Sequence, residues 1–258
     1  MTFAPAKWDE LSYEVTVFLE ETGHKNDGFW DDGTYAAAPY RLAGGGFCAV
    51  GEWDGAKMLR AFWLPRKSRA AAQALFADVC RDLGIARAMV ASNDELFLCL
   101  AFERMHLAGG SFEMQAYNLT FGVPKRPPEF GKECFLRVSE AEYPEMHALT
   151  QDQWAGGIPA GAAFYRVRSG GETLGFGSVY PRALDAGCAD IGNYVLPAHR
   201  RKGVGRSILI NLAYAVIASG AKPTAGCWYY NDNSIRTLTS AGFIPDTRLF
   251  NIEFGSKP

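Results

Sequence analysis

Short apolar segments separated by turn residues recur through the second half of the chain and predict β-strands. The segments are rich in valine, isoleucine, phenylalanine and tyrosine, and glycine, serine or proline bounds most of them. This pattern is typical of short strands joined by tight turns. We expect strands within CFLRVS (134–139), AFYRVRSGGETLGFGSVY (163–180, two strands around a Ser-Gly-Gly turn), ADIGNYVLP (189–197), TAGCWYY (224–230) and RLFNIEF (248–254).

Three segments between these strands have the features of helices. AEYPEMHAL (141–149) predicts a short helix, and NSIRTLTSAGF (233–243) predicts another, with Asn233 as its N-cap and Gly242 just beyond its end. A third helix is predicted after residue 205, because apolar residues recur there on one face. Those residues are Ile208, Leu209, Leu212, Ala213, Val216 and Ile217. The order of elements predicts a mixed α/β fold in which strands outnumber helices.

The first half of the chain weakly repeats this order, which indicates an internal duplication. The repeated unit is a short segment ending in proline, then an amphipathic helix, then a strand ending in asparagine and aspartate. In the first half, the unit consists of WLP (63–65), the run through Leu75, Val79 and Leu83, and ARAMVASND (86–94). In the second half, the corresponding segments are VLP (195–197), the helix after it and AGCWYYND (225–232). The first copy is six residues shorter between its proline and its asparagine, and RKSRAAAQAL, which follows Pro65, contains no glycine.

A break in composition separates the two halves. FGVPKRPPEFGKE (121–133) contains three prolines and two glycines. These residues interrupt any helix or strand pattern and are typical of a linker. We therefore expect one domain over 1–128, a linker at 129–133 and a second domain over 134–258.

The composition is that of a globular chain without a general affinity for polyanions. The chain has 258 residues, of which 48% are hydrophobic and 21% charged, and its net charge is −2. Nucleic acid binding would therefore need a local basic patch. No signal-peptide pattern opens the chain, and no run approaches the roughly 18 apolar residues of a membrane span, so we expect a cytoplasmic protein that does not contact a membrane. The six cysteines are scattered without metal-ligand spacing, so we expect reduced thiols and no metal.

The segment VLPAHRRKGVGRS (195–207) has the most distinctive chemistry. It lies between a predicted strand and a predicted helix, and it combines two glycines with three adjacent cations. The start of a helix leaves about four N–H groups without partners and carries roughly half a positive charge, which attracts phosphate. Glycine allows a ligand to approach those N–H groups closely. The segment therefore indicates a diphosphate site, although an ordinary strand-to-helix turn with solvated cations is the competing interpretation.

Two well-known phosphate loops do not fit this segment. It contains no GxxxxGK[ST], and Ile208 stands where a dinucleotide fingerprint has its third glycine. The segment instead resembles the acyl-CoA loop of the GNAT superfamily of N-acyltransferases, whose pattern is Arg or Gln, two residues, Gly, one residue, then Gly or Ala. Arg200, Gly203 and Gly205 match that pattern. A second family signature is present where a strand ends in Asn231 and a helix leads to the pair Gly242-Phe243.

The resemblance covers residues 134–258 and implies a fold, a reaction and a co-substrate. The fold is a central mixed, mostly antiparallel sheet flanked by helices, with two such domains in tandem, of which the first is degenerate because it lacks the loop. The implied reaction is transfer of an acetyl or other acyl group from acetyl-CoA to a primary amine by direct attack. The residues that the resemblance assigns to acetyl-CoA are Asn193, Tyr194, Val195, Leu196, Arg200, Arg201, Lys202, Gly203, Val204, Gly205, Arg206 and Asn231, with the N–H of Val195 or of its neighbour polarising the thioester carbonyl.

The catalytic groups are less clear from the sequence. The family often places a tyrosine four residues before the glycine of its Gly-Phe pair to protonate the leaving thiolate, and this chain has Leu238 there. Tyr229 or Tyr230, or a water molecule, are the remaining candidates for the acid. Asp190 is the carboxylate nearest in sequence to the reactive segment and is the candidate base, although a solvated carboxylate at the end of a strand is the commoner role.

Two other functions remain open from the sequence. Leu238 and the degenerate first half are compatible with an acyl-CoA-binding sensor or interaction module that performs no catalysis. Nucleic acid binding through the cations of the loop is less favoured, because that patch is small. The acceptor is not identified by any residue, although Glu140, Glu142, Glu145 and Asp152 would favour a cationic amine. A monomer and a homodimer are both compatible with the sequence.

Overall fold

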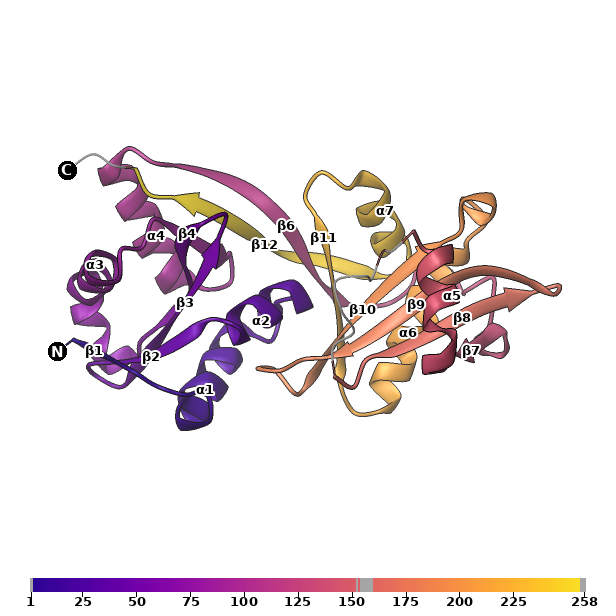
Figure 1. Cartoon of the computed structure of the whole chain (residues 1–258), viewed down its shortest axis with the longest axis horizontal. Helices are drawn as coiled ribbons and strands as arrows, with labels where there is room; N and C mark the ends of the chain where they lie inside the picture. Colours follow the sequence, from indigo (N-terminus) through magenta and orange to yellow (C-terminus); the bar gives the residue numbers. More distant parts are fainter. Residues whose placement is uncertain (1, 152, 154–159, 256–258) are drawn as a thin grey trace. The chain divides into compact units, whose positions relative to one another are not determined.

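A computed structural model describes residues 2–151, 153 and 160–255 of the chain (Figure 1). Its twelve strands follow the hydrogen-bonded order β1-β2-β3-β4-β5-β12-β6-β11-β10-β9-β8-β7. Pairing is mostly antiparallel and is parallel between β4 and β5 and between β10 and β11. The fold is therefore the mixed α/β, mostly antiparallel sheet with helices that the sequence predicts.

The chain divides into two compact units. The described residues of 1–118, 183–185 and 247–258 form unit 1, and those of 119–182 and 186–246 form unit 2. Both units therefore contain residues from each half of the sequence. The linear division at 128–134 stays a prediction about the domains, because compact units and duplicated domains need not share boundaries.

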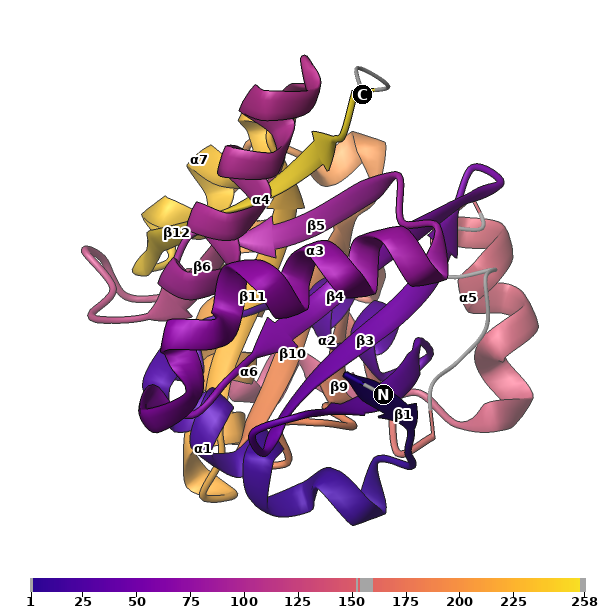
Figure 2. The ribbon, with the colours of Figure 1, turned by 90° about the vertical axis from the view of Figure 1, so that its left-hand side faces the viewer.

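Unit 1 packs helices against a set of strands from the first half of the chain (Figure 2). Its core includes residues of α3, α4, β4 and β5. A short 3₁₀ segment, η2 (Arg66–Ala71), leads from β4 into α3. The strands lying wholly in unit 1 are β1 (Phe3–Pro5), β2 (Ala38–Leu42), β3 (Gly46–Trp53), β4 (Ala56–Trp63) and β5 (Arg87–Ala91), and the helices are α1 (Ser12–Thr22), α2 (Gly28–Tyr35), α3 (Ala72–Leu83) and α4 (Glu95–Ala108).

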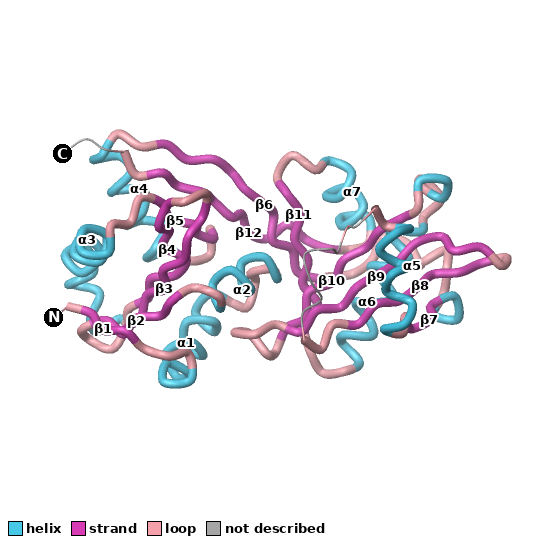
Figure 3. The backbone as a smooth tube through the Cα atoms, in the orientation of Figure 1, coloured by secondary structure: helices cyan, strands magenta, loops and turns pink. Residues whose placement is uncertain are grey.

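In unit 2, strands β8, β9 and β10 pair side by side and carry helices on both faces (Figure 3). Phe176 of β9 packs into an apolar cluster with Met146 of α5. The adjacent Gly177 faces α6, because an added Cβ would meet Ile208 and Leu212 at 2.6 Å. The elements are β7 (Phe135–Arg137), α5 (Tyr143–Leu149), β8 (Ala163–Ser169), β9 (Glu172–Pro181), β10 (Cys188–Val195), α6 (Val204–Ala218), β11 (Lys222–Trp228) and α7 (Asp232–Ser240).

Two long strands contribute residues to both units. They are β6 (Ser111–Phe121) and β12 (Phe243–Glu253). At the unit 2 end of β6, the ring of Phe121 packs edge-on against Phe243 with centroids 5.1 Å apart. At the unit 1 end of β12, residues 249–253 pair with β5 in antiparallel register. The last strand of the sequence therefore completes the sheet of the first unit.

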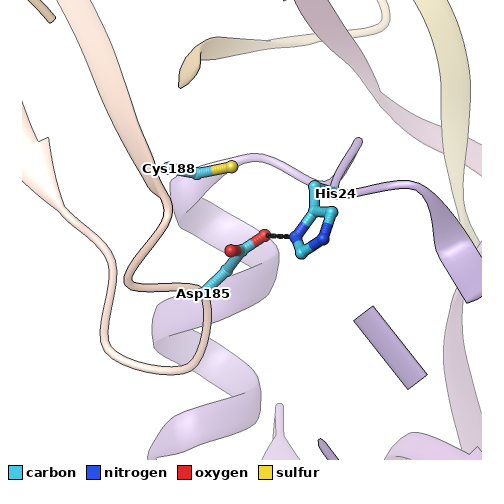
Figure 4. Close-up of side chains that lie close together, drawn as sticks. All are labelled: His24, Asp185 and Cys188. Carbon is cyan, nitrogen blue, oxygen red and sulfur yellow. Dashed lines mark hydrogen bonds and ion pairs between the residues drawn. The ribbon is translucent and has the colours of Figure 1, made fainter. Parts of the chain in front are cut away.

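The loop between β9 and β10 also belongs partly to unit 1. Asp31 in α2 is fully buried, and its carboxylate accepts hydrogen bonds from the backbone N–H groups of Ala183, Leu184 and Asp185 at 2.8, 3.1 and 3.2 Å. Asp185 in turn accepts a 2.9 Å hydrogen bond from Nδ1 of His24 (Figure 4). Three residues of the second half are therefore held by polar contacts inside the first unit.

The structure corrects two local sequence predictions. The N-cap of α7 is Asn231 rather than Asn233, because the Oδ1 atom of Asn231 accepts the N–H of Ser234 and the helix begins at Asp232. Strand β11 ends at Trp228, so Tyr229 and Tyr230, which the sequence places at the end of this strand, lie in the turn that follows it. Gly242 follows α7 with a φ of 96°, as predicted for a residue that ends a helix.

The described helices are all too short or too polar to cross a membrane.

Candidate functional site

The ladder between β10 and β11 opens after three residue pairs. Cys188, Ala189 and Asp190 pair with residues 222–224 in parallel register, and the pairing of the described residues ends there. On its other side, β10 remains paired with β9 as far as Val195. The two parallel strands therefore separate, and one edge of β10 is left open between them.

Hydrogen-bond parity identifies which backbone groups face this opening. The N–H of Leu196 donates to the carbonyl of Leu174 at 3.0 Å, which is the β9 side. Backbone groups alternate direction along a strand, so those of Asn193 and Val195 point to the β11 side. Two N–H groups and two carbonyls thus face the opening, where they can bind an extended amide-containing chain as a further strand would.

The loop after β10 has a backbone conformation that lets a ligand come close to the main chain. Arg201 and Gly203 have φ values of 64° and 78°, in the left-handed region. Gly203 is the N-cap of α6, and the carbonyl of Gly203 accepts the N–H of Ser207 at 3.0 Å. Because Gly203 has no side chain, the N-cap residue does not cap the N–H groups of the first turn of α6. This arrangement fits a bound diphosphate.

The cations of the loop differ in their surroundings. Arg200, Arg201 and Lys202 are exposed, whereas Arg206 in the first turn of α6 is largely buried. The Nε atom of Arg200 donates to the carbonyl of Val195 at 3.2 Å, and its guanidinium lies 6.0 Å from the ring centroid of Tyr194. Arg200 therefore stands at the end of the opening, beside the backbone groups that face it.

An acidic residue from the segment before β7, Glu129, also reaches this loop. The Glu129 carboxylate forms an ion pair with Arg206, and Ser207 Oγ lies 3.3 Å from its Oε2 atom. A Cβ added at Gly203 would lie 2.3 Å from the same oxygen. Glu129 could not be identified from the sequence, because nothing in the composition of 121–133 connects it with a helix that begins 75 positions later.

The side chains on the α6 side of β10 support the loop by packing. A Cβ at Gly205 would meet Thr237 at 3.0 Å, Asn193 at 3.1 Å and Val195 at 3.3 Å. Gly205 therefore allows the first turn of α6 to pack tightly against β10 and α7. Asn231, expected to hold the pantetheine arm, has a structural contact in which its side chain caps α7.

The candidate base Asp190 belongs to a polar group at the closed end of the opening. The Thr224 hydroxyl donates to Asp190 Oδ1 at 3.2 Å, and Arg182 Nη2 donates to the Thr224 oxygen at 2.6 Å. Arg182 is buried, with 5% exposure. Asp190 is thus fixed by a partner on the neighbouring strand, at the point where the two strands separate.

The candidate acids differ in exposure. The side chains of Tyr229 and Tyr230 are 37% and 79% exposed in the turn after β11. Leu238, at the position where the GNAT family often has tyrosine, is 3% exposed and packs in α7. Tyr194 carries a buried hydroxyl with no hydrogen-bond partner among the described residues. These positions do not identify which residue acts as the acid.

Unit 1 contains a comparable opening that is filled by its own side chains. Among the described residues, β4 and β5 pair in parallel at Met58–Leu59 with Arg87–Ala88. Directly after this pairing, Arg60 is 4% exposed and its Nη1 atom lies 3.0 Å from the sulfur of Met89 on β5. Burial lowers the pKa of Arg60 to about 10. Arg60 stands five residues before Pro65, and Gly192 stands five residues before Pro197 in the second half. Unit 1 therefore has a buried guanidinium at the position where unit 2 has no side chain.

The counterpart of the glycine loop in unit 1 has a different shape. The chain passes from β4 through the 3₁₀ segment η2 into α3, without a glycine. Trp63 closes the end of β4, where it is 4% exposed and donates from Nε1 to Glu21 at 2.9 Å. Arg69 contacts the same Glu21 oxygen at 2.6 Å. One cation of this segment, Arg69, is therefore paired with a carboxylate within the unit.

Two family models match the chain, one in each half. The profile of the "Acetyltransferase (GNAT) domain" matches residues 7–118, and that of the "Acetyltransferase (GNAT) family" matches residues 129–243. The chain consists of two GNAT acetyltransferase domains in tandem. The family implies acyl-CoA as co-substrate, together with an acceptor. The residues around the opening and the loop fit that co-substrate.

Solved structures share the fold at low sequence identity. An acetyltransferase from the GNAT family of Colwellia psychrerythraea is 16% identical over 98% of this chain and 100% of its own, with a TM-score of 0.79. A tandem GNAT protein from the clavulanic acid biosynthesis pathway is 16% identical over 99% and 98%, with a TM-score of 0.60. A putative acetyltransferase from Pyrococcus horikoshii is 12% identical over 99% and 89%, with a TM-score of 0.52. No curated protein sequence matches the chain.

Proposed function

We propose that the chain transfers an acetyl group from acetyl-CoA to a primary amine of its acceptor, using the second GNAT domain. The observation that carries this proposal is the opening between β10 and β11 directly before the glycine loop. The open edge of β10 suits the amides of an extended pantetheine arm, and the start of α6 suits a diphosphate. In CoA the pantetheine arm is joined to the diphosphate, and in this domain the open edge of β10 is followed directly by the start of α6.

The roles of individual residues follow from this placement. We expect the diphosphate near Gly203, so the arm runs back along β10 and its thioester end lies toward Asp190. The N–H of Asn193 or of Val195 then polarises the thioester carbonyl, since both face the opening. An oxyanion donor of this kind contributes about 3 kcal/mol to transition-state stabilisation in other enzymes. The other residues proposed to contact acetyl-CoA are Tyr194, Leu196, Arg200, Arg201, Lys202, Val204, Gly205, Arg206 and Asn231.

The proposed chemistry is direct attack without a covalent enzyme intermediate. The acceptor nitrogen forms a bond to the thioester carbonyl carbon, the carbon–sulfur bond breaks, and the CoA thiolate leaves. The acceptor must first lose a proton from its ammonium form, and Asp190 is the proposed base. Consecutive residues of a strand advance by about 3.3 Å, so Asp190 lies roughly 10 Å along the strand from Asn193. We therefore expect the proton to reach Asp190 through water rather than directly.

The proposed acid is Tyr229, Tyr230 or water. A thiolate is a good leaving group, and the loss of general acid assistance costs about 10²- to 10⁴-fold in rate. Leu238 therefore predicts a slower reaction than a tyrosine at that position would give, and it does not prevent the reaction.

A second candidate function is an acyl-CoA sensor without catalysis. Leu238 supports it, because an apolar, buried residue occupies the place from which an acid often acts. We further propose that the first domain binds no acyl-CoA, because it has no glycine loop and the buried Arg60 lies between β4 and Met89 of β5, where the second domain has its opening.

The test is an assay of the full-length protein with acetyl-CoA and a panel of primary amines. Release of free thiol that depends on one amine, together with calorimetric binding of acetyl-CoA, would support acetyl transfer. Binding without thiol release on any amine would favour the sensor. Absence of acetyl-CoA binding would overturn both functions.

A further inference from the structure

Glu129, which the sequence predicts to lie in a linker, places its carboxylate at the glycine loop before α6. Glu129 and Phe130 both donate their backbone N–H groups to Ser207 Oγ, at 2.9 and 3.2 Å. Asn211, one helical turn later, donates from Nδ2 to the carbonyl of Phe130 at 2.9 Å. The backbone of residues 129–130 is therefore fixed along the first two turns of α6.

This anchoring directs the Glu129 side chain toward the start of the helix. Its carboxylate pairs with Arg206 and lies so close to Gly203 that a Cβ there would be 2.3 Å from Oε2. The space that glycine leaves open at the loop is thus occupied by an internal anion. A carboxylate at this end of α6 also interacts favourably with the helix dipole.

Arg206 is the cation on which this contact depends. Its side chain is 16% exposed and that of Glu129 is 41% exposed. The Nε atom of Arg206 is buried without a hydrogen-bond partner among the described residues. The guanidinium therefore has one terminal nitrogen committed to Glu129 and one donor still unsatisfied.

We propose that Glu129 is an internal counter-anion that acyl-CoA must displace from Arg206 and Gly203 when its diphosphate binds. This inference rests on the proposed function, since it assumes that the loop takes a diphosphate. Both groups are anionic and both require the same helix end, so their simultaneous presence would be electrostatically unfavourable. Glu129 consequently lowers the affinity of the protein for acyl-CoA and stabilises the arginine in the absence of the ligand.

The experiment compares Glu129→Gln with the full-length wild-type protein by calorimetric titration of acetyl-CoA at low ionic strength. Glutamine keeps the size of the side chain and an oxygen for Ser207 while it removes the charge. We expect acetyl-CoA to bind about three- to tenfold more tightly, and the gain to shrink as salt screens the interaction. A loss of folding would not increase affinity, so a gain separates this role from a merely structural one.

Glu133→Gln is the matched control, because it removes the same charge from the same linker. The carboxylate of Glu133 lies beside Gly131 and Cys134 and not at the loop. We expect its affinity to stay within about twofold of wild type, since only distant charge is lost. An equal gain in both variants would assign the effect to net charge and overturn the proposal.

Further outcomes separate this inference from the proposed function. Unchanged or weaker binding by Glu129→Gln, with clear binding by the wild-type protein, would overturn the counter-anion role alone. Absence of acetyl-CoA binding in both the wild-type protein and Glu129→Gln would overturn the counter-anion role together with the proposed function. Binding seen only in Glu129→Gln would support both.

Discussion

Gly203 provides a test at the scale of a single residue. Its φ of 78° makes any side chain there strained, at about 1 kcal/mol or more, and an added Cβ would lie 2.3 Å from a carboxylate oxygen of Glu129, so that side chain would also have to move. We expect Gly203→Ala to lower acetyl-CoA affinity at least tenfold, because the methyl group stands between the N–H groups and the diphosphate. Calorimetric titration measures this change.

Gly220 is the control for backbone strain. It has a φ of 87°, lies just beyond the other end of α6, and an added Cβ there would meet nothing within 4 Å. Gly220→Ala should destabilise the protein by a similar amount, about 1 kcal/mol, and leave acetyl-CoA affinity unchanged. Equal losses of affinity in both variants would show that strain, not obstruction of the loop, causes the effect.

Asp94 gives a second prediction at this scale, on stability and pH. Burial raises the pKa of Asp94 to about 7, although its carboxylate caps α4 by accepting the N–H of Phe97. Arg69 lowers this pKa and Glu21 raises it by smaller amounts. Between about pH 4 and pH 7 the folded state therefore holds a proton that the unfolded state has lost, so this residue's contribution to stability falls as the pH rises through that range.

Asp94→Asn should remove that dependence, because asparagine keeps the cap without a charge. Relative to wild type, we expect the variant to gain about 1–3 kcal/mol in unfolding free energy between pH 4 and pH 8. Urea unfolding at the two pH values measures the difference. Asp54→Asn, at a residue whose side chain is 78% exposed, is the control and should show no such gain. A constant difference between Asp94→Asn and wild type would contradict the assignment.

At the scale of elements, Asn231 joins the end of β11 to the start of α7. Its side chain caps that helix, and we also propose that it contacts the pantetheine arm. Asn231→Ser should keep the cap and lose the contact, whereas Asn231→Ala should lose both and cost about 1 kcal/mol of stability. We expect both variants to bind acetyl-CoA several-fold more weakly, while only the alanine variant shows a lower melting temperature. Wild-type affinity in the serine variant would restrict Asn231 to its capping role.

At the scale of the whole molecule, we expect the two domains to differ in acyl-CoA binding. The second domain has the glycine loop and an open strand edge, whereas in the first domain the buried Arg60 of β4 contacts Met89 of β5 directly after the short parallel pairing. We expect one acetyl-CoA to bind per chain, since the first domain has no glycine loop before its helix α3 and carries the buried Arg60 beside β5. Calorimetry at a protein concentration well above Kd measures the ratio. A ratio near two would contradict the loss of the first site.

The sequence by itself determined most of the local structure of this protein. Hydrophobic spacing located α6 and the strands of the second half, because periodicities of 3.6 and 2 follow from backbone geometry alone. The glycines of the loop and the Asn231 to Gly242-Phe243 signature indicated the GNAT family, since they depend on residues close in sequence. The N-cap of α7 was misplaced by two residues, because Asn231 and Asn233 are both good caps and only the hydrogen bond distinguishes them.

Only the tertiary structure decided which distant segments meet. A hydrophobic strand pattern specifies that a face is buried but not which strand will pair with it, so the pairing of β12 with β5 could not be read from residues 248–254. The capture of residues 183–185 by Asp31 and the approach of Glu129 to Gly203 depend in the same way on the placement of whole elements. Local chemistry therefore fixed the loop and its family, and long-range packing fixed the groups that surround them.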